Sequence, residues 1–159
     1  MNSRQLKDIV IVPSLIALGL NTPSAVSLLL GTCAQESNMG HYLVQQNIGF
    51  KGGIGIYQMQ RGTYDDIWSR KINDKVAIKA RIRLMLGYEG KPPAERMATD
   101  MTLATIMTRL FYAAIPNPLL ASDDIRGIGE YWKRYYNTAL GKGTVDEFVT
   151  NYRKYVIGL

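Results

Sequence analysis

The sequence predicts a single, mainly α-helical domain that is interrupted by one glycine-rich segment at about residues 40–58. Apolar residues recur at helical spacing along most of the chain, and capping and breaker residues divide this pattern into segments of helix length. The interruption holds five closely spaced glycines, Gly40, Gly49, Gly52, Gly53 and Gly55. With 159 residues, 47% apolar and 20% charged, the chain (1–159) has the size and composition of one globular domain.

The first half of the chain predicts two helices and a turn-rich segment. A first helix is expected over residues 3–18. Thr22 as the cap and Pro23 at the first helical position open a second helix, which runs to Ser37 and is ended by Gly40. The glycine-rich segment that follows predicts a loop or a small β-hairpin.

The second half predicts helices joined by proline- and glycine-containing connections. A helix is expected from Thr63, because Thr63 and Asp66 form a T-x-x-D capping signal. Further helices are expected over residues 74–87, 101–114, 123–137 and 145–157. The last is opened by the capping box Thr144-x-x-Glu147.

The N-terminal sequence has two interpretations. Arg4 and Lys7 precede an apolar run, as in a secretory signal, but Asp8 and the lack of a small-residue cleavage site favour a structural first helix. The run is shorter than the roughly 20 apolar residues of a membrane span, so no stable membrane insertion is expected. The chain is therefore expected to be made in the cytoplasm without a cleaved signal.

Charge and residue types limit the chemistry. A net charge of +6 favours an anionic partner, without choosing between nucleic acid, lipid and bacterial cell wall. Basic residues such as Lys79, Arg81 and Arg83 have the spacing of an exposed helix face, so nucleic-acid binding is not expected. One cysteine and one histidine, without HExxH or paired CxxC spacing, predict no disulfide, metal or cofactor.

Glu36 is the first candidate catalytic residue. Most helical carboxylates are solvated, but Cys33, Thr32 and Leu29 precede Glu36 by one and two turns, which places it on an apolar stripe. Partial desolvation raises the pKa of a carboxyl group and keeps it protonated near neutral pH, as a general acid requires.

The glycine-rich segment supplies the second half of the candidate site. Glycines let the backbone approach a ligand closely, and Tyr57, Gln58 and Met59 follow Gly55 with groups suited to sugar binding. A plain hairpin with glycines at its turns is the alternative interpretation.

Together these segments resemble the soluble lytic transglycosylase and goose-type lysozyme families of the lysozyme-like superfamily. The shared pattern is a helix ending in Glu-Ser, a loop, a Gly-x-x-Gly-Leu-Met-Gln motif and a helix with an early Thr. This chain has Glu36-Ser37, then residues 52–58, then Thr63; Ile56 stands for Leu, and Tyr57 replaces Met. The resemblance implies a lysozyme-like fold with Glu36 as the catalytic acid and Ser37, Gly55, Tyr57, Gln58 and Met59 as substrate-binding residues.

Later segments resemble the same superfamily more loosely. The families carry a tyrosine near the catalytic glutamate, and Tyr112 is the candidate, although the usual following Asn is missing. Residues 131–144 resemble bacteriophage members, which implies an endolysin or virion-associated protein acting on the periplasmic cell wall, with virion proteins as further partners. Trp68, Trp132, Tyr131, Tyr135 and Tyr136 fit either sugar stacking or the core.

The resemblance implies cleavage of the β-1,4 bond between MurNAc and GlcNAc in peptidoglycan glycan strands. Hydrolysis normally uses two carboxylates, yet no Asp or Glu lies between Glu36 and Asp65. A lytic transglycosylase needs one, because the sugar's own 6-hydroxyl attacks and leaves a 1,6-anhydroMurNAc end. Transglycosylase is therefore favoured, and a hydrolytic muramidase using Asp65 or Asp66 stays open.

Two other classes of protein are compatible with parts of the sequence. A cysteine peptidase would pair Cys33 with His41, but Cys33 lies late in its helix on an apolar face rather than at a helix N-terminus, which favours an inert thiol. A catalytically inactive phage tail or structural protein on the same fold also stays open.

Overall fold

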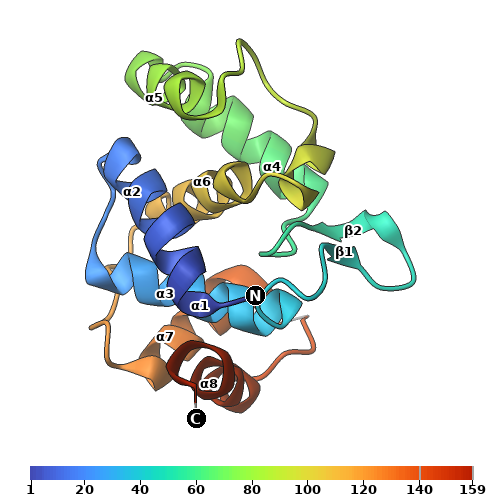
Figure 1. Ribbon diagram of the computed structural model, residues 1–159, viewed down its shortest axis with the longest axis vertical. Helices are drawn as coiled ribbons and strands as arrows, with labels where there is room; N and C mark the ends of the chain where they lie inside the picture. The colour runs from blue at the N-terminus through green and yellow to red at the C-terminus, as the bar shows by residue number, and fades with distance from the viewer. Residues whose placement is uncertain (140, 159) are drawn as a thin grey trace.

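The computed structural model describes residues 1–139 and 141–158, and most of these are helical, as the sequence predicts (Figure 1). The elements up to the hairpin are α1 (Ser3–Gln5), η1 (Leu6–Ile11), α2 (Val12–Leu18), α3 (Pro23–Ser37), β1 (Val44–Gln45) and β2 (Gly49–Ile54). They are followed by α4 (Arg61–Ile67), η2 (Trp68–Ile72), α5 (Val76–Leu86), η3 (Ala94–Ala98) and α6 (Met101–Ala113). The last are α7 (Ile125–Trp132), η4 (Lys133–Asn137), α8 (Val145–Tyr152) and η5 (Arg153–Ile157).

The predicted first helix is confirmed as one continuous stretch of α1, η1 and α2. The side chain of Asn2 caps its first turn by accepting from the Gln5 N–H, and Gly19 ends it with a φ of 71°. Leu6, Ile11 and Leu15 are buried along it. The apolar run therefore forms part of the core of this domain.

Helix α3 begins and ends as predicted, but a different residue ends it. Thr22 accepts from the Ala25 N–H at 3.1 Å, and Pro23 is the first helical residue. The helix stops at Ser37, because Asn38 already adopts a left-handed φ of 50°. Asn tolerates this conformation through local hydrogen bonding, so Asn38, and not Gly40 as predicted, is the residue that ends the helix.

Residues 44–59 contain the predicted hairpin. β1 and β2 pair antiparallel, with Val44 opposite Ile54 and Gln45 opposite Gly49, and an irregularity lies between these pairs. Beyond β2 the backbone of Ile54 bonds reciprocally to that of Met59, which closes a second, tighter turn. Two residues of that turn, Gln58 and Met59, line a pocket.

The later helices follow the prediction with shifted ends. α5, α6, α7–η4 and α8–η5 occupy the four predicted stretches, and the Thr144–Glu147 capping box is present. The predicted Thr63–Asp66 cap is absent, because α4 begins at Arg61 and the extended residue that precedes it is Gln60. The backbone of Gln60 accepts the Tyr64 N–H, so Thr63 lies inside the helix rather than at its end.

The helices gather at two ends of the molecule. α3, α7 and α8 pack together at one end, α4 and α5 lie at the other, and α6 runs between them, with the hairpin at one side (Figure 1). The core joins these parts and includes the fully buried rings of Trp132, Tyr57, Tyr64 and Phe148. Among the described residues, no helix has both the length and the apolar character needed to traverse a bilayer.

Candidate active site

Glu36 lies in the last turn of α3, half-buried, where that helix meets α7 and η4. Its Oε1 accepts a hydrogen bond of 2.8 Å from the indole Nε1 of Trp132, the last residue of α7. Trp132 is fully buried and its ring lies against that of Phe148 in α8, at a centroid distance of 5.3 Å. The carboxyl group is thus held by a side chain that the surrounding core fixes in place.

The electrostatic environment suits an acid that is protonated near neutral pH. Burial raises the pKa of Glu36 from 4.5 to about 7, and the hydrogen bond from Trp132 opposes part of that rise. The apolar stripe inferred from the sequence accounts for the burial, since Cys33 and Thr32 are fully buried one turn earlier. A carboxyl group with this pKa can donate a proton to a leaving group and then act as a base.

Ser37 ties the end of α3 to the tight turn after the hairpin. Its Oγ donates to the carbonyl oxygen of Ile56 at 2.6 Å and accepts the N–H of Gly40 at 2.8 Å. The resemblance implies that Ser37 contacts substrate. The side chain is fully buried, however, so it does not line the pocket. It fixes the turn relative to Glu36 instead.

Gly55 sets the conformation of that turn. Its φ is +75°, and a Cβ on it would lie 2.4 Å from the carbonyl oxygen of Met97 in η3. Glycine is therefore required by both the backbone conformation and the close approach of η3. The turn is closed by the Gln58 N–H, which donates to the carbonyl of Gly55 at 3.0 Å, and Gly55 itself shapes the site without lining the pocket.

A pocket of about 360 Å³ opens beside Glu36. Its walls are polar side chains together with two apolar ones, and come from four places in the chain: Glu36; Gln58, Met59, Gln60 and Thr63; Phe111; and Tyr136, Asn137 and Thr138. Amide and hydroxyl groups of this kind form hydrogen bonds with sugar hydroxyls, while an aromatic ring offers an apolar face. Gln58 and Met59 are thus at the pocket, as the sequence predicts.

The pocket continues into a second hollow of about 400 Å³. Thr63 and Phe111 line both, and the second extends along α4 and the end of α6 to Asp66, Lys71 and Ile115. Because they share these two walls, the hollows adjoin, and together they are called the groove, with Glu36 in the first hollow. Two adjoining hollows suit a polymer better than a small isolated molecule.

Tyr57 is not a wall of this groove, contrary to the prediction. Its side chain is fully buried, and its hydroxyl lies 3.1 Å from Oγ1 of Thr105 in α6. In this turn Ile56 and Tyr57 are both fully buried, whereas the next two residues, Gln58 and Met59, line the pocket. The ring anchors the turn to α6.

Tyr112 is also behind the pocket rather than in it. It is buried, its hydroxyl lies 2.8 Å from Oγ1 of Thr32, and its ring packs against that of Tyr136 at 5.5 Å. Tyr136 is the tyrosine that lines the pocket, and its hydroxyl donates to the carbonyl of Tyr57 at 2.7 Å. Burial raises the pKa of both phenols, and the nearby Glu36 carboxylate adds to the rise.

The structure thus identifies site residues that the sequence left undecided. Trp132 and Tyr136 are four residues apart, a spacing that places both on one face of a helical segment. That spacing was the available signal, but helical aromatic stripes usually belong to the core. Phe111 and Asn137 had no distinguishing pattern.

Asp65 and Asp66, the two acidic residues that the sequence offers as a second carboxylate, both form ion pairs. Asp65 forms an ion pair with Lys91, and Asp66 forms one with Arg70 at 2.6 Å. Asp66 lines only the second hollow, so Glu36 is the one carboxylate among the described residues around the first pocket.

Cys33 has the environment of an inert thiol. It is fully buried, and burial raises its pKa to about 12, which keeps it protonated. Within the described part of the chain, no group of three or more His, Cys, Asp or Glu side chains gathers as metal ligands do. Comparisons with protein families, curated proteins and solved structures gave no match to the chain.

Proposed function

We propose that the protein cleaves the β-1,4 bond between MurNAc and GlcNAc in bacterial peptidoglycan, as a lytic transglycosylase with Glu36 as its acid and base. The observation that carries the proposal is the half-buried Glu36 carboxyl, with a pKa of about 7, beside a pocket lined mainly by polar side chains. A protonated carboxyl at neutral pH has little structural use in a helix end. It is the group that glycosidic bond cleavage requires.

The reaction follows from one carboxyl group acting twice. Glu36 donates its proton to the glycosidic oxygen as the bond from that oxygen to C1 of MurNAc breaks, which releases the GlcNAc hydroxyl end. The resulting carboxylate then accepts the proton of the MurNAc 6-hydroxyl, while the oxygen of that hydroxyl bonds to C1. This step forms the 1,6-anhydro ring and returns Glu36 to its protonated state.

Trp132 stabilises the intermediate stage of this cycle. Its N–H donates to the Glu36 oxygen in either protonation state, but the bond is stronger when the carboxyl is ionised. The attacking hydroxyl belongs to the substrate and is held close to C1, so no second protein base is needed. This agrees with Glu36 being the sole carboxylate among the described residues around the pocket.

The order of the elements supports a lysozyme-like identity for the domain. A helix ending in Glu36-Ser37, a hairpin, the Gly55–Gln58 turn and a helix carrying Thr63 occur in the chain order of the family pattern. The first helix, the turn and the last helix contribute Glu36, Gln58 and Thr63 to the first pocket. Ser37 bonds the end of α3 to the turn, and Gly55 lets the turn approach η3 closely. On the resemblance of residues 131–144 to bacteriophage members, we further propose a role in phage-mediated wall degradation, at lysis or from the virion.

Mass spectrometry of purified peptidoglycan digested by the protein tests the proposal. We expect fragments that end in 1,6-anhydroMurNAc from the wild type and none from Glu36→Gln. Reducing MurNAc ends would instead identify a muramidase, and Asp66→Asn would then show whether the carboxylate of the second hollow takes part. Unchanged peptidoglycan with both proteins would overturn the enzyme proposal and favour the non-catalytic phage protein.

A further inference from the structure

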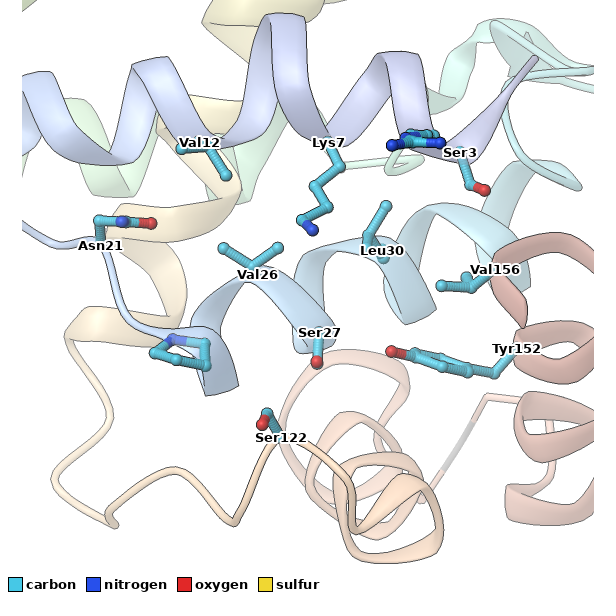
Figure 2. A pocket seen from close by; sticks show the side chains of 12 residues that line it. Ser3, Lys7, Val12, Asn21, Val26, Ser27, Leu30, Ser122, Tyr152 and Val156 are labelled. Atoms are coloured by element: carbon cyan, nitrogen blue, oxygen red, sulfur yellow. The ribbon is translucent and has the colours of Figure 1, made fainter.

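A second cavity lies away from the groove, between the N-terminal helix, α3 and the C-terminal helix (Figure 2). Its volume is about 670 Å³, within the usual range of ligand pockets. Ser27 of α3 lines it and precedes Glu36 by nine residues, which corresponds to about 14 Å along the helix axis. The cavity is therefore separate from the site of bond cleavage.

Polar groups from three elements are aimed into this cavity. Lys7 extends from the N-terminal helix toward α3, and the hydroxyl of Tyr152 points from α8 toward Ser27 (Figure 2). Tyr152 is 6% exposed as a residue, and it lines the cavity. Its hydroxyl, which points into the cavity, is placed to bond to something that enters it (Figure 2).

The charge of the cavity is positive. Lys7 and Arg4 line it, and no acidic side chain does so. Arg4 is shared with the exposed Asp8 at 3.8 Å, whereas Lys7 has no ion pair in the described structure. An anion that enters would thus meet one unshared cation directly.

The floor of the cavity is apolar. Val26 and Leu30 of α3 form it, with Val12 and Val156 on either side. These side chains provide room for short aliphatic groups next to the cations and hydroxyls. The cavity combines the features that bind a molecule carrying carboxylates, amides and small apolar side chains.

From these contacts we infer that this cavity binds an acidic peptide, namely the stem peptide attached to peptidoglycan. The inference rests on the proposed function for the choice of this peptide. Its free carboxylates would pair with Lys7 and Arg4, its amides with Tyr152 and Ser27, and its alanine methyl groups would lie on Val26 and Leu30. Because the wall is cross-linked, a peptide of a neighbouring strand can occupy the cavity while the groove holds a glycan.

The concave shape distinguishes this ligand from an anionic bilayer. A membrane surface meets protruding cations and apolar side chains, whereas Tyr152 and Leu30 lie within the cavity walls and are 6% and 5% exposed. A flexible chain segment can follow such a concave wall more closely than a headgroup layer.

Fluorescence anisotropy with a labelled synthetic stem peptide, which carries D-Glu and meso-diaminopimelate but no sugar, tests the inference on the whole protein. We expect Lys7→Glu to weaken binding by about tenfold or more, through loss of the cation and repulsion of the carboxylate. Tyr152→Phe keeps the ring that packs against Phe148 and removes only the hydroxyl, so a drop of about fivefold is expected. Lys75→Glu, an equal charge change on an exposed residue before α5, is the matched control and should leave binding unchanged.

Peptidoglycan cleavage by the same preparations separates the two proposals. Binding that depends on Lys7 and Tyr152 supports the peptide site, even in a protein that cleaves no glycan. Cleavage without peptide binding, or equal loss of binding with Lys7→Glu and Lys75→Glu, overturns the peptide site and leaves the proposed function standing. Lys7-dependent binding to phosphatidylglycerol vesicles without peptide binding would overturn it in favour of lipid.

Discussion

Replacing Trp132 by Phe should shift the pH dependence of catalysis to higher pH. The substitution keeps an aromatic ring in the core and removes the indole N–H that donates to Glu36 at 2.8 Å. That bond favours the ionised carboxyl and opposes the effect of burial, which raises the pKa. Without it, Glu36 should hold its proton to a higher pH.

The size of the shift follows from the strength of the bond. A hydrogen bond to a charged group contributes roughly 1.5–3 kcal/mol, and each pKa unit corresponds to about 1.4 kcal/mol. The protonated carboxyl also accepts from the indole, more weakly, so only part of that energy distinguishes the two states. We therefore expect the pKa to rise from about 7 to roughly 8.

The assay is kcat/KM for release of soluble fragments from purified peptidoglycan, measured between pH 5 and pH 9. Since Glu36 must begin the reaction protonated, the wild-type rate should fall as pH rises through about 7. The falling limb should move up by about one pH unit in Trp132→Phe. Trp68→Phe is the matched control, because Trp68 is equally buried but packs against Tyr64, away from Glu36.

A falling limb at the same pH in wild type and Trp132→Phe would refute this reasoning. Loss of the larger ring from a packed core is destabilising by itself and could lower the rate. Thermal unfolding of both Trp variants measures this destabilisation. Loss of rate without a shift in pH dependence would mean that Trp132 acts only through packing.

Three further substitutions have defined outcomes. Glu36→Gln should abolish cleavage and stabilise the protein above about pH 7, by up to about 3 kcal/mol. The protonated carboxyl contributes stability that is fully present below its unfolded pKa of 4.5 and lost as pH rises through about 7, so denaturant melts at pH 4 should differ much less. Tyr57→Phe should keep wild-type kcat/KM and cost about 1 kcal/mol of unfolding free energy, because its hydroxyl bonds only to buried Thr105; a large loss of rate would return Tyr57 to the groove. Gly55→Ala should lower unfolding free energy by more than about 2 kcal/mol, since it adds both a strained φ and an overlap with Met97; a wild-type melting temperature would contradict this.

The sequence predicted the partly buried environment of Glu36, and for a physical reason. The apolar residues one and two turns before Glu36 are close to it in any helix, so its partial burial and raised pKa follow from local spacing. The Thr22–Pro23 start of α3 and the Thr144–Glu147 box were equally readable, because a cap is made by residues a few positions apart. The residue that ends α3, Asn38, and the start of α4 at Arg61 were not identified, since several nearby residues could have served.

The direction in which each motif side chain points was not available from local spacing. Tyr57 and Gln58 are neighbours in the same turn, yet one anchors the core against α6 and the other lines the pocket. Likewise Tyr112 was selected as the tyrosine near Glu36, and Tyr136 reaches the pocket instead. Both choices depend on where α6 and η4 lie relative to α3.

By itself, then, the sequence determined the mainly helical class, the hairpin and the buried acid at the end of α3, because these depend on contacts within a few residues. The tertiary structure decided which donor holds that acid, since Trp132 is 96 residues away along the chain. It also decided the groove walls and the basic cavity at Lys7 and Tyr152, which exist only where helices distant in sequence pack together. Such packing is set by the whole core, and no local pattern specifies it.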